Sequence, residues 1–338
     1  MLAEAHTRAQ SVLHAAAGTI FTGAVARVER EGRLVWERAY GTTRLDGAAQ
    51  PVYCDTVFDL ASLTKPFVST AALAAVASGA LKLDEPLGRS VVPEWRESPF
   101  EGVTSRMLLA HTAGLQSGAD YRQLLGEDVE RYVLTRPPAV EPKTSVLYSD
   151  FGFIVLGVVL ERVHGRALSG IVRGYRPRFE CRAAIPATED DGWRGRVQGV
   201  VHDEKAYLMG GVAGHAGLFG TASGVARLGE VYLAALHGRA TSLDRSLARE
   251  AVREQAADPV LRRGLGWALK TTDENSCGRW FSPQSFGHTG FVGTCIWADP
   301  ERDLCAVLLT NSVYFGRNDT REFRARFFEA VIEDLGLR

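Results

Sequence analysis

Cysteine, lysine and uninterrupted apolar runs are scarce in this chain of 338 residues. The five cysteines are scattered, odd in number and without a C-x-x-C pair, which argues against a disulfide framework and a zinc ribbon. No apolar run reaches the roughly 20 residues of a membrane span, so buried helices are expected. The formal net charge is -1 without blocks of like charge, which gives no footprint for nucleic acid or anionic lipid. We therefore expect a small, neutral or weakly charged substrate, and no nucleic-acid or membrane partner.

The first 20 residues lack the layout of a secretory signal. Glu4, Arg8 and two histidines interrupt what should be an apolar stretch, so the segment predicts an amphipathic helix. Core thiols in a reducing compartment would explain the cysteine pattern. Together these features predict a cytoplasmic location, and no feature indicates a cofactor.

Strand-like sequence occurs near both ends of the chain. Residues 21–43 alternate apolar and polar side chains around Glu31-Gly32, and residues 287–312 form two apolar runs around Asp299-Pro300, so each segment predicts a hairpin. The last helix aligns four apolar residues on one face: Phe323, Phe327, Val331 and Leu335. Strands from both ends are therefore expected to share one sheet.

Between about residues 62 and 240 the pattern changes to helices separated by Gly, Pro and Asn/Asp punctuation. We predict an α/β sheet domain of residues 1–61 and 241–338, with an all-α domain of residues 62–240 inserted in it. A cleft between two such parts is a natural active site.

The segment LASLTKPF places Ser62 and Lys65 three residues apart. At this spacing a helix brings both side chains to one face, and a buried, neutral amine could take the proton of a serine nucleophile. The N–H of a serine at a helix start could also help to hold an oxyanion. The alternative is that Ser62 is an N-cap and that Lys65 faces solvent.

Tyr148 and Asp150 precede an apolar helix in the segment LYSDFGF. A phenol near the lysine amine could share the serine proton and return it to the leaving group. The alternative is a core tyrosine beside an N-capping Asp150.

The segment GHTGF, with His288, Thr289, Gly290 and Phe291, opens a strand. Gly290 would let a substrate lie along this strand, and the N–H of Phe291 could be a second oxyanion donor. The alternative is a strand that simply begins after a turn.

These three motifs, in this order, resemble those of the serine β-lactamase and penicillin-binding protein superfamily. The class C-like branch, with its D-stereospecific carboxypeptidases and family VIII-type esterases, is the most similar. The resemblance covers roughly residues 20 to 335 and includes the segments VTSRMLLAHTAGL, GLFGTASGVARL and WADPERDLCAVLLTN.

The resemblance implies a β-lactamase-like fold, an antiparallel sheet flanked by terminal helices with a helical domain inserted. It implies Ser62 as the nucleophile, with Lys65 and Tyr148 as the general base pair. The N–H groups of Ser62 and Phe291 would form the oxyanion hole. The substrate-facing residues would be Asp150, His288, Thr289 and Gly290.

Two residues depart from that family pattern. Asp150 stands where asparagine is usual, and a carboxylate beside Lys65 favours the charged amine, which leaves proton transfer more to Tyr148. His288 stands where lysine is common, and a neutral imidazole holds a carboxylate less firmly than a fixed cation. An ester or an uncharged amide is therefore at least as plausible a substrate as a penicillin.

The segment VVHDEKAYLMGGVAGHAGLF gathers His202, Asp203, Glu204 and His215. Its spacing matches no H-E-x-x-H pattern, so we expect no metal, and His202 and His215 are expected to line the cleft or to brace a loop.

The leading function is a serine hydrolase that forms an acyl-enzyme on Ser62 with a small ester or amide, cell-wall fragments included. A binding or sensing module that acylates without efficient turnover is the alternative. A G-x-S-x-G elbow, which an α/β-hydrolase would need, does not occur.

Overall fold

The computed structural model describes residues 7–176, 179–257 and 261–338. Its main sheet has the strand order β2-β1-β12-β11-β10-β9-β8-β7, and the neighbouring strands are antiparallel. The strands are β1 Gly23–Arg30, β2 Arg33–Gly41, β7 Ala256–Ala257, β8 Arg262–Arg263, β9 Ala268–Leu269, β10 Phe286–Thr289, β11 Cys295–Asp299 and β12 Leu304–Thr310. Because β1 pairs with β12, the two ends of the chain share one sheet, as expected, and both predicted hairpins are confirmed.

Helices cover both faces of this sheet, which explains why β12 is buried along its whole length. Alternate residues of β12 face opposite layers: Leu304, Ala306 and Leu308 join one core, and Cys305, Val307 and Leu309 join the other.

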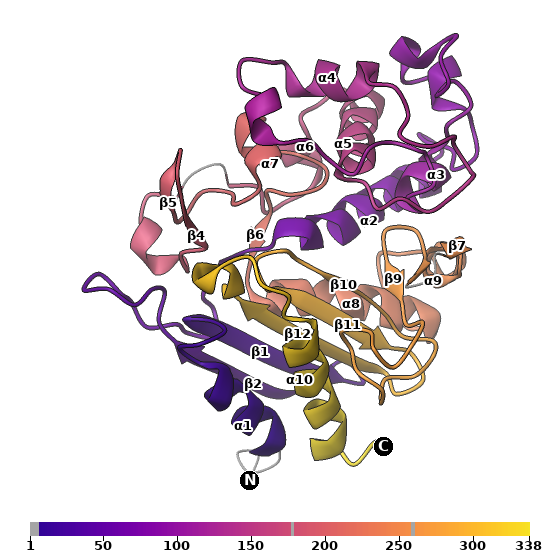
Figure 1. Ribbon diagram of the computed structural model, residues 1–338. Helices are drawn as coiled ribbons and strands as arrows, with labels where there is room; N and C mark the ends of the chain where they lie inside the picture. The colour runs from indigo at the N-terminus through magenta and orange to yellow at the C-terminus, as the bar shows by residue number, and fades with distance from the viewer. Residues whose placement is uncertain (1–6, 177–178, 258–260) are drawn as a thin grey trace.

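The first core lies under α1 (Thr7–Ala16) and α10 (Arg321–Asp334), which pack side by side on one face of the sheet (Figure 1). The predicted apolar face of α10 is confirmed: Phe323, Phe327 and Val331 are buried, and Leu335 packs against the same core. Residues 1–6 of the predicted first helix lie outside the described residues.

The opposite face is covered by α8 (Ala222–Leu236), which contacts β1, β11 and β12. Gly229 permits a close approach, since a Cβ there would lie 2.6 Å from the Cys305 sulfur. The helical range expected from the sequence, 62–240, therefore includes a helix that packs on the sheet.

The other helices of the middle region pack around α2 (Thr64–Ala77) and α5 (Asp150–His164). Every residue of α5 from Phe151 to Leu160 is buried. Shorter helices surround this pair or follow it: α3 Ser105–Leu109, α4 Val129–Thr135, α6 Leu168–Ile171, α7 Glu204–Leu208 and, beside α8, α9 Arg245–Val252. Short 3-10 helices complete the fold: η1 Ala61–Leu63, η2 Leu87–Arg89, η3 Pro93–Trp95, η4 Tyr121–Gln123, η5 Arg182–Ala184 and η6 Ser312–Phe315.

Two small strand pairs interrupt this mainly helical region. β3 (Phe58–Asp59) pairs with β6 (Phe219–Gly220), and β4 (Glu189–Asp191) pairs with β5 (Gly195–Val197). The β3-β6 pair joins the segment before Ser62 to the segment before α8.

Cys277, Cys295 and Cys305 are buried, as expected for core thiols, whereas Cys54 is half-buried and Cys181 is exposed. The expectation of core thiols is therefore wrong for Cys181. Within the described parts of the chain, no helix combines the length and the apolar character that crossing a membrane requires.

Candidate active site

Ser62 lies in η1, just before α2. Ala61 has a positive φ of 46°, a backbone conformation that is strained for any residue other than glycine. The N–H of Ala61 donates to the buried carboxylate of Asp59 at 2.8 Å. Lys65 is completely buried, and its Nζ lies 3.0 Å from Ser62 Oγ. The capping alternative is therefore wrong: Leu63 occupies the N-cap of α2, and Lys65 does not face solvent.

Tyr148 and Asp150 approach Lys65 from the start of α5. Ser149 is the N-cap of this helix, and its Oγ accepts from the N–H of Gly152 at 2.9 Å. Asp150 therefore does not cap the helix, and its Oδ1 accepts a hydrogen bond from Lys65 Nζ at 2.8 Å. The Lys65 ammonium lies 4.7 Å from the centre of the Tyr148 ring.

These neighbours decide the charge of Lys65. Burial by itself lowers the pKa of the amine, but Asp150 and Tyr148 together outweigh burial and raise the pKa above its ordinary value. Burial likewise opposes ionisation of Asp150, whereas Lys65, His215 and Lys205 bring its pKa below the ordinary value. The pair is therefore an ammonium and a carboxylate, which is the effect expected from the aspartate at position 150.

A second buried lysine lies on the other side of Asp150, and the sequence interpretation missed it. Lys205 Nζ lies 3.3 Å from Asp150 Oδ2 and 2.9 Å from Asp203 Oδ2. Asp203 also accepts from His215 Nε2 at 2.7 Å, and the His215 carbonyl lies 3.5 Å from Lys65 Nζ. Lysine is scarce in this chain, and that scarcity was the signal that could have pointed to Lys205 as it pointed to Lys65.

Asp150, Asp203 and His215 offer ligand atoms that lie within 4.8 Å of one another, close enough in principle for a metal ion. Both carboxylates already face the ammonium of Lys205, and Asp150 also faces that of Lys65. The chain thus supplies the positive charge that the two carboxylates require.

His288 on β10 is buried, and its Nδ1 lies 2.9 Å from the carbonyl oxygen of Thr289. A carbonyl oxygen can only accept, so Nδ1 carries the hydrogen. Burial, followed by the charges of Lys65 and Arg263, lowers the pKa of His288 to about 3. The imidazole is therefore neutral at physiological pH.

Gly290 lies against the segment that precedes Ser62. A Cβ at this position would lie 2.6 Å from the carbonyl oxygen of Leu60 and 2.0 Å from Thr294 Oγ1. Glycine is therefore required here for the close backbone contact. Gly290 also lines the cavity that contains Ser62.

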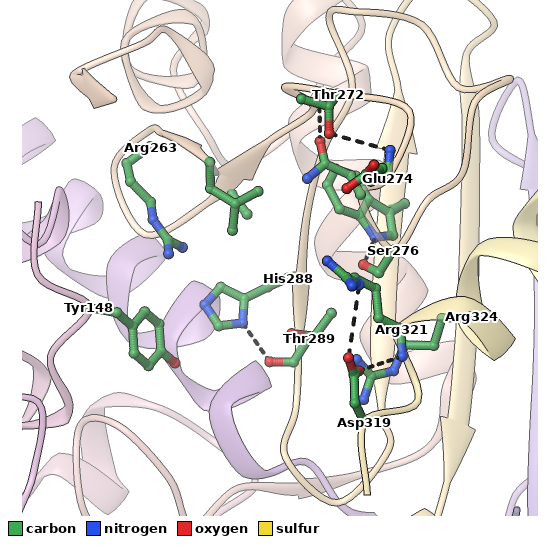
Figure 2. Close-up of a pocket in the computed structure, with 14 residues that line it drawn as sticks. Tyr148, Arg263, Thr272, Glu274, Ser276, His288, Thr289, Asp319, Arg321 and Arg324 are labelled. Atoms are coloured by element: carbon green, nitrogen blue, oxygen red, sulfur yellow. Dashed lines mark hydrogen bonds and ion pairs between the residues drawn. The ribbon is translucent and has the colours of Figure 1, made fainter. Parts of the chain in front are cut away.

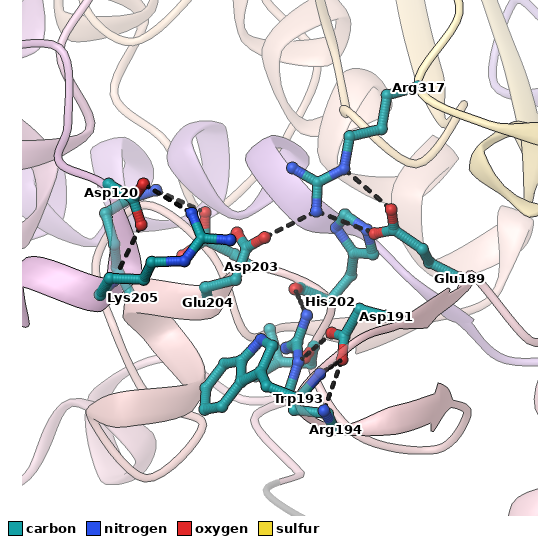
Figure 3. A network of polar contacts seen from close by, with 12 residues as sticks. Asp120, Glu189, Asp191, Trp193, Arg194, His202, Asp203, Glu204, Lys205 and Arg317 are labelled. Atoms are coloured by element: carbon teal, nitrogen blue, oxygen red, sulfur yellow. Dashed lines mark hydrogen bonds and ion pairs between the residues drawn. The ribbon is translucent and has the colours of Figure 1, made fainter. Parts of the chain in front are cut away.

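Phe291 is 54% exposed and lines the same cavity as Ser62. Its ring stacks on His202 at 5.7 Å, and His202 is held by Glu189 at 2.7 Å (Figure 3). Arg317 pairs with Glu189 at 2.9 Å. His202 is buried behind Phe291, so it braces this wall rather than lining it.

His111, which follows α3, lies beside Tyr148. The two rings are 4.6 Å apart, and His111 Nδ1 accepts from the N–H of Ser149 at 3.1 Å. Burial, with Arg263 and Lys65, lowers the pKa of His111 well below its ordinary value, which keeps Nδ1 free to accept. His111 therefore helps to orient Tyr148.

Two adjoining cavities open at this site. A cavity of about 390 Å³ is lined by Ser62 and Phe291, and one of about 500 Å³ by Arg263 and His288. Four residues line both: Tyr148, Thr289, Asp319 and Arg324.

Arginines surround the larger cavity. Figure 2 shows Arg263 directed toward Tyr148 and His288, with Arg321 and Arg324 on the side of α10. Arg321 pairs with Asp319 at 3.9 Å, whereas the buried Nε of Arg324 has no hydrogen-bond partner. Burial lowers the pKa of Arg324, whereas the thiol of Cys295 and the carboxylate of Asp319 oppose this shift. A guanidinium stays protonated in proteins, so Arg324 brings a positive charge to both cavities.

Serine hydrolases of one fold class combine two features: an antiparallel sheet with terminal helices on one face, and a serine beside a buried lysine and a tyrosine. The model of the family Beta-lactamase matches residues 14–330. The chain belongs to this family and is a serine hydrolase.

Two curated relatives are enzymes of bacteria. The chain is 30% identical to an N-acetylmuramyl-L-alanine amidase of Bacillus subtilis (strain 168), over 86% of this chain and 77% of the relative. It is 28% identical to a putative D-alanyl-D-alanine carboxypeptidase of Escherichia coli (strain K12), over 83% and 76% of the two chains.

Among solved structures, EstCE1, a hydrolase with promiscuous acyltransferase activity, superposes with a TM-score of 0.78. The alignment covers 97% of this chain and 98% of that one at 22% identity. It confirms the β-lactamase-like fold predicted from the sequence.

Proposed function

We propose that the chain hydrolyses an amide bond in a small acidic peptide, of the kind found in cell-wall fragments, through an acyl-enzyme on Ser62. The observation that carries this proposal is the 3.0 Å contact between Ser62 Oγ and the buried Lys65 Nζ at the edge of a cavity. A serine in this position can attack a bound carbonyl once its proton has a destination.

Tyr148 receives that proton, with the Lys65 ammonium 4.7 Å from the centre of its ring. Asp150 keeps Lys65 charged, so the reactive form of the pair is one in which the Tyr148 oxygen has given up its proton beside the ammonium. As Ser62 Oγ bonds to the acyl carbon, its proton passes to Tyr148. Tyr148 returns the proton to the departing amine when the carbon–nitrogen bond breaks, and water repeats the sequence to release the acid.

The oxyanion that forms at the acyl carbon needs two donors. The N–H groups of Ser62 and Phe291 are our candidates, because both residues line the cavity into which the carbonyl would fit. Thr289 and Gly290 form the neighbouring wall, along which we propose that the substrate backbone lies.

The buried Nε of Arg324, which has no hydrogen-bond partner, supports an acidic substrate. The neutral His288 offers no fixed charge, but Arg324 reaches both cavities and can supply it. Arginine binds a carboxylate through two parallel hydrogen bonds. The names of the two relatives, an amidase and a putative carboxypeptidase of peptides, favour the same substrate class.

A substrate panel tests this function. Peptides with a free D-alanyl-D-alanine carboxylate, the same peptides with an amidated end, a chromogenic cephalosporin and short p-nitrophenyl esters are incubated with the protein. We expect steady turnover of the free peptide, lost in Ser62→Ala. A stoichiometric burst without turnover would instead support the binding module.

Arg324→Gln tests the substrate class. We expect the KM of the free peptide to rise about tenfold, with little change for the amidated peptide or the esters. Arg326→Gln, on the same helix but exposed, is the matched control. An equal effect of Arg324→Gln on charged and uncharged substrates would contradict carboxylate binding.

A further inference from the structure

Lys205 is only 8% exposed, and the reaction proposed above gives it no step. Its ammonium reaches Asp150 from α7, while Lys65 reaches the same carboxylate from α2. Asp150 Oδ1 lies 2.8 Å from Lys65 Nζ, and Asp150 Oδ2 lies 3.3 Å from Lys205 Nζ. Each oxygen of this one carboxylate thus faces its own ammonium.

Asp203 and His215 hold Lys205 in this position. Asp203 Oδ1 accepts from the N–H of Ala206 at 2.8 Å as the N-cap of α7, and its Oδ2 lies 2.9 Å from Lys205 Nζ. His215 Nε2 lies 2.7 Å from Asp203 Oδ1. The carboxylate that anchors Lys205 is therefore itself fixed by a helix N-terminus and a buried histidine.

Asp150 and Lys205 act in opposite directions on the charge of Lys65, although both cations stabilise the Asp150 carboxylate. A carboxylate that faces only Lys65 would hold the proton of that amine strongly, because opposite charges in a buried site stabilise each other. A second fixed positive charge at the same carboxylate weakens that hold. Burial opposes the charge of Lys205, but Asp203 and Asp150 outweigh burial and raise its pKa, so it stays charged across the working range.

We propose that Lys205 is a positioning residue that offsets the charge of Asp150, so that the Lys65–Tyr148 pair can release a proton near neutral pH. The proposal rests on the function proposed above, and it assigns the buried pair Asp150–Lys205 a role in setting the pH range of the enzyme.

Other charged or titratable groups face the same pair. They are Arg263 on β8, His288 on β10, His111 after α3, and Asp203 and His215 around α7. Burial keeps His111 and His288 neutral, and the positive charge of Arg263 is the same in every variant considered below. Asp203 and His215 remain in place in every variant, so a change of pH profile that Lys205→Met shows and Lys205→Arg does not show reports on the charge at position 205.

The experiment measures two rates between pH 5 and 9.5. One is the labelling of Ser62 by a fluorophosphonate, and the other is kcat/KM for p-nitrophenyl butyrate. The variants are Lys205→Met, Lys205→Gln, Lys205→Arg, Asp150→Asn and the double variant Asp150→Asn with Lys205→Met. Lys270→Met is the matched control, because Lys270 is also buried and donates to the carbonyl oxygens of Arg279 and Phe281, outside this network.

For Lys205→Met and Lys205→Gln we expect the acid limb of both profiles to move at least one unit to higher pH. That shift makes the rate at pH 7 about tenfold lower, because tenfold less of the base is free. Lys205→Arg keeps the native limb. The double variant returns the limb to the native pH or below, because no carboxylate remains to be offset.

A loss of rate by one constant factor at every pH, without rescue in the double variant, would overturn the proposal and leave Lys205 a structural role. A shift of equal size in Lys270→Met would overturn it too. Thermal unfolding and circular dichroism identify the variants that fold. Should Lys205→Met not fold, the double variant, which loses both opposite charges, is compared with Asp150→Asn instead. Labelling or turnover that persists in Ser62→Ala would instead refute the function itself.

Discussion

At the scale of single residues, the charge of Lys65 determines how this site can work. The ammonium donates to Ser62 Oγ and to Asp150 Oδ1, so it cannot at the same time accept the serine proton. In the proposed reaction, Tyr148 carries that proton in transit. His111 orients Tyr148 through the ring contact and through the N–H of Ser149.

Tyr148→Phe removes the phenol oxygen and keeps the ring. We expect kcat to fall by roughly 10²- to 10⁴-fold, the usual contribution of a general acid–base group, with an unchanged midpoint of thermal unfolding. Steady-state kinetics on a p-nitrophenyl ester measures the effect. Tyr132→Phe, whose hydroxyl lies on the exposed side of α4, is the control, and a kcat for Tyr148→Phe within threefold of the native value would refute this role.

The sequence predicted which residues form the site, but it predicted only some of the contacts between them. Asp150 follows Tyr148 by two residues, so its closeness to Lys65 followed once Tyr148 was placed there. Lys205 and Arg324 reach the site from distant elements, and no local spacing relates them to Ser62. The packing of α7 and α10 against distant parts of the chain decides these contacts, and sequence periodicity does not encode that packing.

At the scale of elements, apolar periodicity predicted the hairpins and α10 but not the layer to which each helix belongs. α8 is as apolar as the helices of the middle region, yet it packs on the sheet. The strands β7, β8 and β9 have two residues each, too few for an alternating pattern to be visible. A helix pattern indicates which face is buried, and only the fold decides against which layer.

Glu230 lies on α8, and its pKa reports on how this helix packs. Burial, with the nearby carboxylates of Glu29 and Asp303, raises the pKa of Glu230 to about 7, and its Oε1 has no hydrogen-bond partner. A raised carboxyl pKa means that the folded state binds the proton more tightly than the unfolded state. The stability it contributes is therefore full below the ordinary value of 4.5 and is lost as pH rises to about 7.

Glu230→Gln is expected to raise the free energy of unfolding at pH 8 by on the order of 1 kcal/mol, after allowance for solvent screening. At pH 5 we expect little change. Urea unfolding at both pH values measures the difference, with the exposed Glu301→Gln as control. Equal effects at pH 5 and pH 8 would show that Glu230 does not titrate as described.

At the scale of the whole molecule, Asn311 joins three distant parts of the chain. Its Oδ1 accepts from the N–H groups of Thr22 and Gly23 at 3.1 Å each. Its Nδ2 donates to Thr22 Oγ1 at 2.8 Å and to the carbonyl oxygen of Ala187 at 2.7 Å. The first strand, the last strand and the middle region thus meet at one buried amide.

Asn311→Ala leaves several buried polar groups without their partner. We expect the free energy of unfolding to fall by about 3 kcal/mol, measured by urea denaturation. Asn318→Ala, at an exposed position a few residues further on, should change it by less than about 0.5 kcal/mol. A similar small change for Asn311→Ala would mean that this junction does not support the fold.

Every step of the proposed reaction depends on Ser62 as the residue that carries the acyl group. Acid-quenched protein from a reaction with p-nitrophenyl butyrate, analysed by intact-mass spectrometry and peptide mapping, tests this directly. We predict one butyryl group per chain, located on Ser62 and absent from Ser62→Ala. An acyl group on another residue, or equal acylation of Ser62→Ala, would contradict the account.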